Sequence, residues 1–595
     1  MRNSFASKFL ALSTILIGGL LSAPSALAAD VERGFLCLNQ VNLDCAARVA
    51  DGLGEDPTST LLKARVAFHQ GDFERAAELS GRILDKAAAV DLDPIRSVLP
   101  PRLSIPLEEL SSARIARYRS IGVPIPSPDD EAPAVTLQLG VDAAGDFELL
   151  RAWMEREHDL FLASAQAAEG LVVTRRGNVE VLHHPGIERI LVQEAADAIT
   201  QAEERIAPLL GGPVPGVVRV EIYPNRSEFI AATGLPKSSV NTTGVVAISK
   251  WNRLLLISPR ALGDGYGWRD TLVHEWVHLV VSYHSKDMAP IWLQEGLAKS
   301  TEMLWRQDDF ELEVSKQSLL AGALKTDRWV TFEQMHPSMA FLPSPELAGL
   351  AYAQVASMMA FLQEQTDPKV LARVIERVGK GQDAKDSVAA EANGGDFDRF
   401  EREWKAWLGT LDLIGEKVAI DAVGEHIEGG PDAIGAGEGA EDVGFDPVLS
   451  RRKELANRAR LGDLMAEQGQ HEAAMLYFEQ AMPPGEPASP AVILAASKSL
   501  VVLGRTEQAM SLLVENLTYY PEEAGTQKMA AELWRAQGQD AKALNAYLAS
   551  SEVNPFDVEV QQALVALYAS AGQRERSARH AQILSVLTYS ELEPS

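Results

Sequence analysis

Two histidines and a glutamate lie within five positions of a run that is otherwise almost wholly apolar. The run reads TLVHEWVHLVV over residues 271–281 and contains His274, Glu275 and His278. Because residues four apart lie on one face of a helix, both imidazoles can reach one metal ion, with Glu275 beside it to accept a proton from bound water. Catalytic zinc takes three protein ligands and keeps one position open. The pattern therefore predicts a zinc centre; histidines that only satisfy polar neighbours in the core are the alternative.

A third ligand is needed, and the downstream sequence offers two candidates. His284 follows His278 by six positions, the spacing found in metzincin peptidases. In that family a glycine lets the chain turn back, but Val281 occupies this position here, and an uninterrupted helix would point His284 about 240° away from His278. Glu295 lies in PIWLQEGLAKSTE (290–302), far enough along for a loop and the first turn of an antiparallel second helix. Spacing leaves both candidates open and disfavours His284.

The segment around Glu295 resembles the gluzincin metallopeptidases, in which HExxH is followed by a W-L-x-E-G motif that carries the glutamate ligand. Four residues match that motif: Trp292, Leu293, Glu295 and Gly296. Glu302 matches an acidic residue often found seven positions after the glutamate. The resemblance implies that His274, His278 and Glu295 hold Zn²⁺ and that Glu302 orients a ligating histidine from outside the ligand set.

The resemblance covers about residues 170–408, where the chain is similar to the peptidase MA-like branch of this clan. The stretches VEIYPNRSEFIAATGL, LLLISPRAL and LAYAQVASMMAFL carry it. Related enzymes have a tyrosine on a later helix that donates its hydroxyl to the oxyanion, and Tyr352 matches it; a tyrosine packed in the core is the alternative. Aminopeptidases of this clan hold a free amino end with a G-x-M-E-N motif, which does not occur upstream of His274. Endopeptidase activity is therefore favoured.

These residues imply a peptidase that uses metal-activated water. Zinc lowers the pKa of bound water to about 7, and Glu275 accepts the proton and passes it to the leaving nitrogen. Zinc and the Tyr352 hydroxyl share the developing negative charge. The strand predicted in GVVAISKW (244–251) could pair with an extended peptide substrate by edge addition. The alternative function is a non-catalytic extracytoplasmic scaffold with an inactive peptidase-like domain.

A second pattern begins near residue 451, where helix-turn-helix units repeat. Glycines recur with spacings of 35, 34 and 34 residues: Gly469, Gly504, Gly538 and Gly572. A period of about 34 residues is typical of tetratricopeptide repeats (TPRs), which these units resemble. In the last unit Ser577 replaces the small alanine, a departure that a terminal capping repeat would tolerate. Near the other end of the chain, the segment around Gly71 is similar to one further unit. Such repeats stack into an all-α solenoid whose concave face binds a protein partner.

The first 28 residues are predicted to be a cleaved secretory signal. Arg2 and Lys8 precede a short apolar stretch (9–21), and Ala26-Leu27-Ala28 has the small-x-small cleavage pattern. The stretch spans about 13 residues, whereas a membrane-spanning helix needs about 20. No later segment reaches that length without charges. We therefore expect a periplasmic or secreted protein without a membrane span.

The length and net charge of the chain limit the number of domains and the kinds of partner. A chain of 595 residues is too long for one ordinary core. Its formal net charge of −28 disfavours nucleic acid as a partner, because two polyanions repel. Cys37 and Cys45 could form a local disulfide in an oxidising compartment or remain buried thiols.

The predicted fold is therefore multidomain: an α+β zincin-like metallopeptidase domain joined to an all-α TPR solenoid. The predicted divisions are 1–28 (signal peptide), 29–93 (TPR-like helical segment), 94–165 (proline-rich connector), 166–410 (peptidase domain), 411–450 (acidic, glycine-rich linker) and 451–595 (TPRs).

Overall fold

The computed structural model describes most of the chain outside its first residues and two long connecting segments. The described residues are 26–84, 86, 90, 102–106, 114–115, 117, 136–237, 240, 244–336, 339, 342, 344–392, 395–414, 447–482 and 488–589. Most of the predicted signal peptide and of the acidic linker therefore lie outside them. Among the helices in these ranges, none is both long and apolar enough to cross a membrane.

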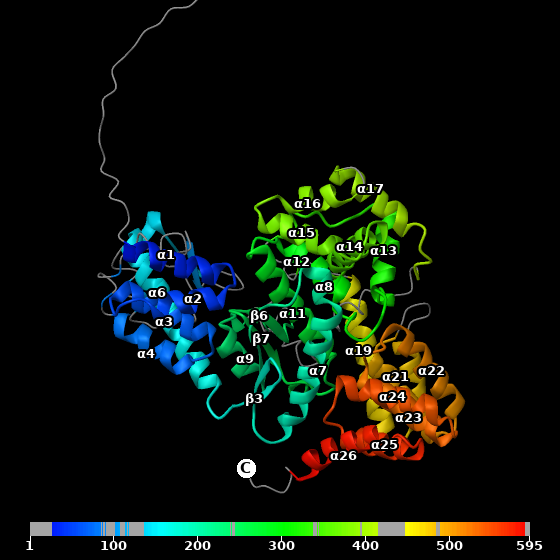
Figure 1. Ribbon diagram of the computed structural model, residues 1–595. Coiled ribbons are helices and arrows are strands. Elements are labelled where there is room, and N and C mark those ends of the chain that lie inside the picture. Colours follow the sequence, from blue (N-terminus) through cyan, green and yellow to red (C-terminus); the bar gives the residue numbers. More distant parts are fainter. Residues whose placement is uncertain are drawn as a thin grey trace, which may run out of the picture.

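Four helices form the N-terminal helical unit, drawn in blue in Figure 1. They are α1 (Ala26–Asn39), α2 (Leu43–Asp51), α3 (Pro57–His69) and α4 (Phe73–Leu84). A disulfide between Cys37 and Cys45 joins α1 to α2. Gly71 turns the chain between α3 and α4 with a φ of 77°, a left-handed conformation that glycine adopts without strain. The stretch predicted as a connector (94–165) includes regular structure, because α6 (Val141–Ala167) packs on α4.

A five-stranded sheet lies at the centre of the molecule, in the order β3-β4-β5-β7-β6. The strands are β3 (Val172–Arg176), β4 (Val179–His183), β5 (Val218–Tyr223), β6 (Ala247–Lys250) and β7 (Arg253–Ile257). The three inner strands run parallel, and β3 and β6 are antiparallel edge strands. The strand predicted within residues 244–251 is therefore present as β6.

The inner strands are buried on both faces, and alternate residues point to opposite sides. Val220, Ile222, Leu254 and Leu256 join the main core with helices α7 (Ile190–Arg205) and α11 (Trp268–Ser285). Tyr223, Leu255 and Ile257 pack on the other face with α6 and α9 (Arg226–Thr233). Helices on both faces explain why β5 and β7 read as almost continuous apolar runs.

The helical part of the peptidase domain follows the sheet. Its helices are α11, α12 (Ile291–Thr301), α13 (Val314–Thr326), α14 (Pro345–Gln365), α15 (Val370–Gly379), α16 (Ala384–Glu391) and α17 (Phe397–Leu408). The chain reverses between α11 and α12 at Lys286 and Asp287, whose φ angles are 54° and 59°. Helices α12 and α14 pack closely at Gly296, where an added Cβ would lie 2.9 Å from the Val355 carbonyl oxygen.

The C-terminal helices form four hairpins stacked in series. They are α19 (Pro447–Glu467), α20 (His471–Ala481), α21 (Pro490–Val502), α22 (Thr506–Tyr519), α23 (Ala524–Ala536), α24 (Asp540–Val553), α25 (Val558–Ser570) and α26 (Arg574–Tyr589). Each hairpin turns at a glycine with a φ of 73–74°. The predicted fold class, an α+β domain joined to a TPR-like solenoid, is confirmed.

The solenoid contacts the peptidase domain at the start of α11. The Tyr266 amide donates to the Val553 carbonyl at 3.3 Å, and Arg269 pairs with Glu552 at 3.1 Å. Val586 on the last helix is buried in the core of the peptidase domain. The two domains therefore share apolar contacts as well as polar ones.

Candidate metal centre

Three potential ligand atoms converge between α11 and α12. The Nε2 atoms of His274 and His278 lie 3.0 Å apart, and Glu295 Oε2 lies 3.3 Å from the first and 3.6 Å from the second. A tetrahedral zinc with bonds of about 2.0–2.1 Å places neighbouring ligands about 3.3–3.4 Å apart. Across all the described residues, this is the one group of histidines and carboxylates close enough to share an ion.

Local structure explains why these side chains meet. His274 and His278 are one helical turn apart on α11, so they share a face. The reversal after α11 brings α12 back alongside it, with Pro290 extended at its start, and Glu295 faces the two imidazoles. The sequence prediction of an antiparallel second helix that carries Glu295 agrees with this arrangement.

The surroundings of the Glu295 carboxylate indicate whether a cation would fit between the three residues. Its Oε2 atom is buried and has no hydrogen-bond partner among the described residues. Burial alone would raise the pKa of Glu295, but the imidazoles of His278 and His274 outweigh burial and hold that pKa well below its usual range. A buried carboxylate oxygen without a partner, facing two ring nitrogens, is the donor set of a zinc site. The residues fit the ion.

Glu302 orients one of these ligands. His274 Nδ1 donates to Glu302 Oε2 at 2.6 Å, which leaves its Nε2 facing Glu295 and His278. Burial opposes a charge on His274, but the carboxylates of Glu295 and Glu302 outweigh it and raise the pKa of His274 to about 10. Lys299 completes the arrangement, because its Nζ donates to Glu302 Oε1 at 3.1 Å. Sequence analysis did not identify Lys299, although its spacing of three residues from Glu302 is a helical pair spacing.

Two further residues predicted for the site, Glu275 and Tyr352, lie on α11 and α14, and both helices pack against α12. Glu275 is 9% exposed and follows His274 on α11. Burial raises the pKa of the Tyr352 hydroxyl on α14, and the carboxylates of Glu295 and Glu275 raise it further. Tyr352 is half-buried and packs against the main core.

His284 lies away from the centre. Its Nε2 donates to the Gly212 carbonyl at 2.9 Å, next to the loop after helix α8 (Ala207–Leu210). Helix α11 continues through His284, so the orientation argument from sequence holds. His284 therefore has a structural partner, and Glu295 is the third residue of the candidate site.

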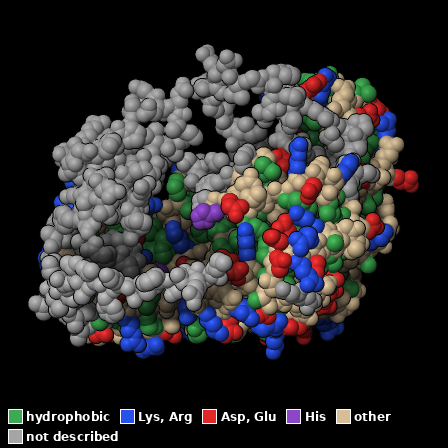
Figure 2. Space-filling view, turned by 90° about the horizontal axis from the view of Figure 1, so that it is seen from above, with side chains coloured by type: hydrophobic (Ala, Val, Ile, Leu, Met, Phe, Trp, Pro, Cys, Tyr) green, Lys and Arg blue, Asp and Glu red, His purple; other side chains and the backbone are tan. Residues whose placement is uncertain are grey.

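The centre reaches solvent. The side chains of His274, His278 and Glu295 are 12%, 14% and 16% exposed. A water molecule can therefore reach ligands that are otherwise well packed. On the face of the molecule shown in Figure 2, acidic and basic side chains are interspersed.

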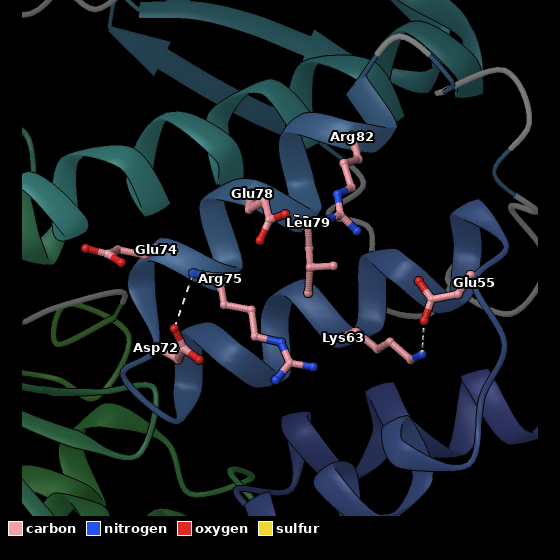
Figure 3. Close-up of a pocket in the computed structure, with 8 residues that line it drawn as sticks. All are labelled: Glu55, Lys63, Asp72, Glu74, Arg75, Glu78, Leu79 and Arg82. Atoms are coloured by element: carbon pink, nitrogen blue, oxygen red, sulfur yellow. Dashed lines mark hydrogen bonds and ion pairs between the residues drawn. The ribbon is translucent and has the colours of Figure 1, made fainter.

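A separate hollow lies on the N-terminal helical unit. It has a volume of about 640 Å³ and is lined by charged side chains of α3, α4 and the loops before them. Figure 3 shows Lys63 and Glu55 paired at its edge, with Arg75 reaching into it. None of the metal-centre residues lines this hollow, and its mixed charges favour no single ligand.

The solenoid places a carboxylate at the start of α11. Glu522, in the loop between α22 and α23, lies against Gly267, where an added Cβ would be 2.9 Å from Glu522 Oε2. Burial raises the pKa of Glu522 to about 8, and the carboxylates of Glu313 and Asp270 contribute to this. Sequence analysis could not identify this residue, because its environment arises from contact between two domains.

Comparison with known proteins assigns the central region. Residues 198–410, which contain α11, α12 and α14, match the sequence model of the Peptidase MA superfamily. This match confirms the resemblance predicted from the sequence for this region.

Two solved structures show limited similarity to the whole chain. Yeast LTA4 hydrolase is 11% identical with a TM-score of 0.24, and the match covers 71% of this chain and 66% of that one. The APC/C hetero-tetramer Cut9-Hcn1 is 12% identical with a TM-score of 0.18, and the match covers 91% and 96%. No curated protein sequence matches the chain.

Proposed function

We propose that the protein is a zinc-dependent endopeptidase of the Peptidase MA superfamily. The observation that carries this proposal is the convergence of His274, His278 and Glu295 around a buried carboxylate oxygen that has no other partner. The match over residues 198–410 supports a peptidase-like hydrolase.

The proposed chemistry uses Glu275 and Tyr352 together with the three candidate ligands. His274, His278 and Glu295 would hold a zinc ion, which would lower the pKa of a bound water to about 7 and polarise a carbonyl. Glu275, beside the ligands, accepts the proton of the attacking water and transfers it to the leaving nitrogen. The Tyr352 hydroxyl, whose raised pKa keeps it protonated at neutral pH, donates a hydrogen bond to the developing oxyanion.

The edge strand β6 supports a binding mode for an extended peptide. It pairs with β7 on one side only and packs against α11, the helix that carries both histidines. An edge strand presents unpaired main-chain groups, so a substrate strand can add to it through backbone hydrogen bonds. This mode recognises backbone conformation more than side chains.

The solenoid and the N-terminal segment extend the proposal. We infer that the TPR-like hairpins bind a protein substrate or partner, because such stacks present a continuous concave surface. The charge pattern and cleavage motif of residues 1–28 support export to the periplasm or beyond. Cell fractionation with and without these residues tests export, and retention of the full-length chain in the cytoplasm would contradict it.

Zinc content and casein cleavage test the catalytic proposal together. The mature protein should contain one zinc per chain and cleave casein, and Glu275→Gln should retain zinc while losing cleavage. Glu311→Gln, a change to an exposed carboxylate, serves as the control and should retain both. Stoichiometric zinc without cleavage, and no difference between the variants, would instead favour the non-catalytic scaffold.

A further inference from the structure

The β6–β7 hairpin turns on two residues with left-handed backbone conformations. Trp251 has a φ of 54° and Asn252 a φ of 59°. Two consecutive positive φ angles match a type I′ turn, in which asparagine and glycine are common. A tryptophan at the first position is unusual, because its Cβ crowds the backbone. Such a conformation persists only when surrounding contacts hold it.

The N-terminal helical unit provides those contacts. The Trp251 ring packs edge-on against the ring of Phe68 on α3, with centroids 4.8 Å apart. Lys250 Nζ lies 4.1 Å from the centroid of the Trp251 ring, on which it forms a cation–π contact. Figure 1 shows these N-terminal helices next to the end of the sheet where β6 and β7 lie.

Arg253, the first residue of β7, adds a second connection. Its guanidinium carbon lies 4.5 Å from the Phe68 ring centroid and 4.7 Å from that of Phe73. The same guanidinium donates to both carboxylate oxygens of Glu221 at 3.0 and 3.1 Å, and both side chains are fully buried. Buried charges that are paired in this way fix the relative positions of the elements that carry them.

A third connection comes from the loop between α1 and α2. The side-chain amide of Asn252 donates to the Val41 carbonyl at 3.5 Å. Val41 lies between the two cysteines of the Cys37–Cys45 disulfide. All three residues from 251 to 253 therefore contact the N-terminal helical unit, although more than 150 residues separate them in the sequence.

This contact region continues directly into the strand proposed to bind substrate. The register of the hairpin pairs Ala247 with Leu256 and Lys250 with Arg253, so β6 moves with the turn that precedes Arg253. The other face of the hairpin packs against α11. A shift of the turn would therefore change the distance between the free edge of β6 and the metal ligands.

We propose that Trp251 is a positioning residue through which the N-terminal helical unit fixes the edge strand β6 for pairing with an extended peptide substrate. This inference rests on the proposed function, because it assigns β6 a role in substrate binding. Trp251 acts through β6 and lies outside the ligand set, so its loss affects substrate binding and leaves the metal and the chemical step intact.

The effect should appear in KM. Trp251→Gly removes the ring contact and lets the turn adopt other conformations, since glycine suits positive φ without strain. We expect KM to rise roughly five- to tenfold, because one or two main-chain hydrogen bonds between β6 and the substrate would weaken. We expect kcat and the zinc content to stay unchanged. Trp251→Phe keeps an aromatic ring against Phe68 and should restore most of the affinity.

The test uses the full mature chain and a fluorogenic peptide that spans a casein bond cleaved by the wild-type protein. Steady-state KM and kcat, zinc content and thermal unfolding are measured for each variant. Trp534→Ala, which removes a half-buried indole from the solenoid, is the matched control and should leave KM unchanged. Phe68→Leu removes the same ring contact from the α3 side and should also raise KM. The test therefore remains possible if the Trp251→Gly protein does not fold.

Two results overturn the inference, and they can be distinguished. If the zinc-loaded wild-type protein cleaves no casein, the proposed function and this inference both fail. If the wild-type protein cleaves the peptide but both Trp251→Gly and Phe68→Leu retain its KM, or lose kcat and zinc instead, only the positioning role fails.

Discussion

Replacement of Glu302 by alanine tests whether this carboxylate orients a zinc ligand. The substitution removes the acceptor 2.6 Å from His274 Nδ1 and the counter-charge 3.1 Å from Lys299 Nζ. Loss of such an outer partner typically lowers metal affinity about 10- to 100-fold, or about 1.4–2.7 kcal/mol. We expect the upper half of this range, because the lost bond is charge-assisted and the unpaired ammonium then repels the cation.

Two further variants separate these contributions. Glu302→Gln keeps an oxygen that can accept from Nδ1 but removes the charge, so its loss should be about tenfold. Adding Lys299→Met removes the unpaired ammonium and should restore part of the affinity. Zinc dissociation constants are measured by competition with a chromophoric chelator at fixed pH and salt. If Glu302→Ala binds zinc as tightly as the wild-type protein, the carboxylate does not orient His274, and the reasoning is wrong.

Three other predictions have distinct outcomes. Glu295→Ala should abolish stoichiometric zinc binding while His284→Ala retains it; elemental analysis that gives the reverse would reinstate the histidine as third ligand. Gly296→Ala should lower the free energy of unfolding by about 1–3 kcal/mol in chemical denaturation, because its Cβ would meet a backbone oxygen at 2.9 Å. Gly322→Ala, a helical glycine with open space around it, is the control and should stabilise by about 0.5–1 kcal/mol. The pKa of Glu522 is about 8 in the folded protein, against 4.5 for a solvated glutamate. Its neutral form therefore stabilises the protein below pH 4.5, and this stabilisation is lost as pH rises through 8. Glu522→Gln should therefore raise the melting temperature at pH 8 and hardly change it at pH 4; equal shifts at both values would contradict the assignment.

Local patterns in the sequence predict which three candidate ligands come together. The spacing of His274 and His278 depends only on helix geometry, and the motif around Glu295 follows after a short reversal. The fold class follows from similarly local signals, since apolar runs indicate the strands and the glycine period indicates the hairpins.

Contacts between distant segments could not be predicted in this way. Nothing in the sequence near Trp251 indicates that Phe68 packs against it, and Glu522 reaches the start of α11 only because the solenoid packs there. Helix α6 was not identified within the stretch read as a connector, because prolines dominate the first part of that stretch. These features depend on tertiary packing, which periodicity does not encode.

Anomalous X-ray diffraction above and below the zinc edge, from crystals of the mature protein grown with zinc, tests the central claim most directly. The account predicts one strong peak present only above the edge, within bonding distance of the two Nε2 atoms and of Glu295 Oε2. A zinc-containing protein whose anomalous peak lies elsewhere, with the Glu295 side chain turned away from the imidazoles, would contradict it.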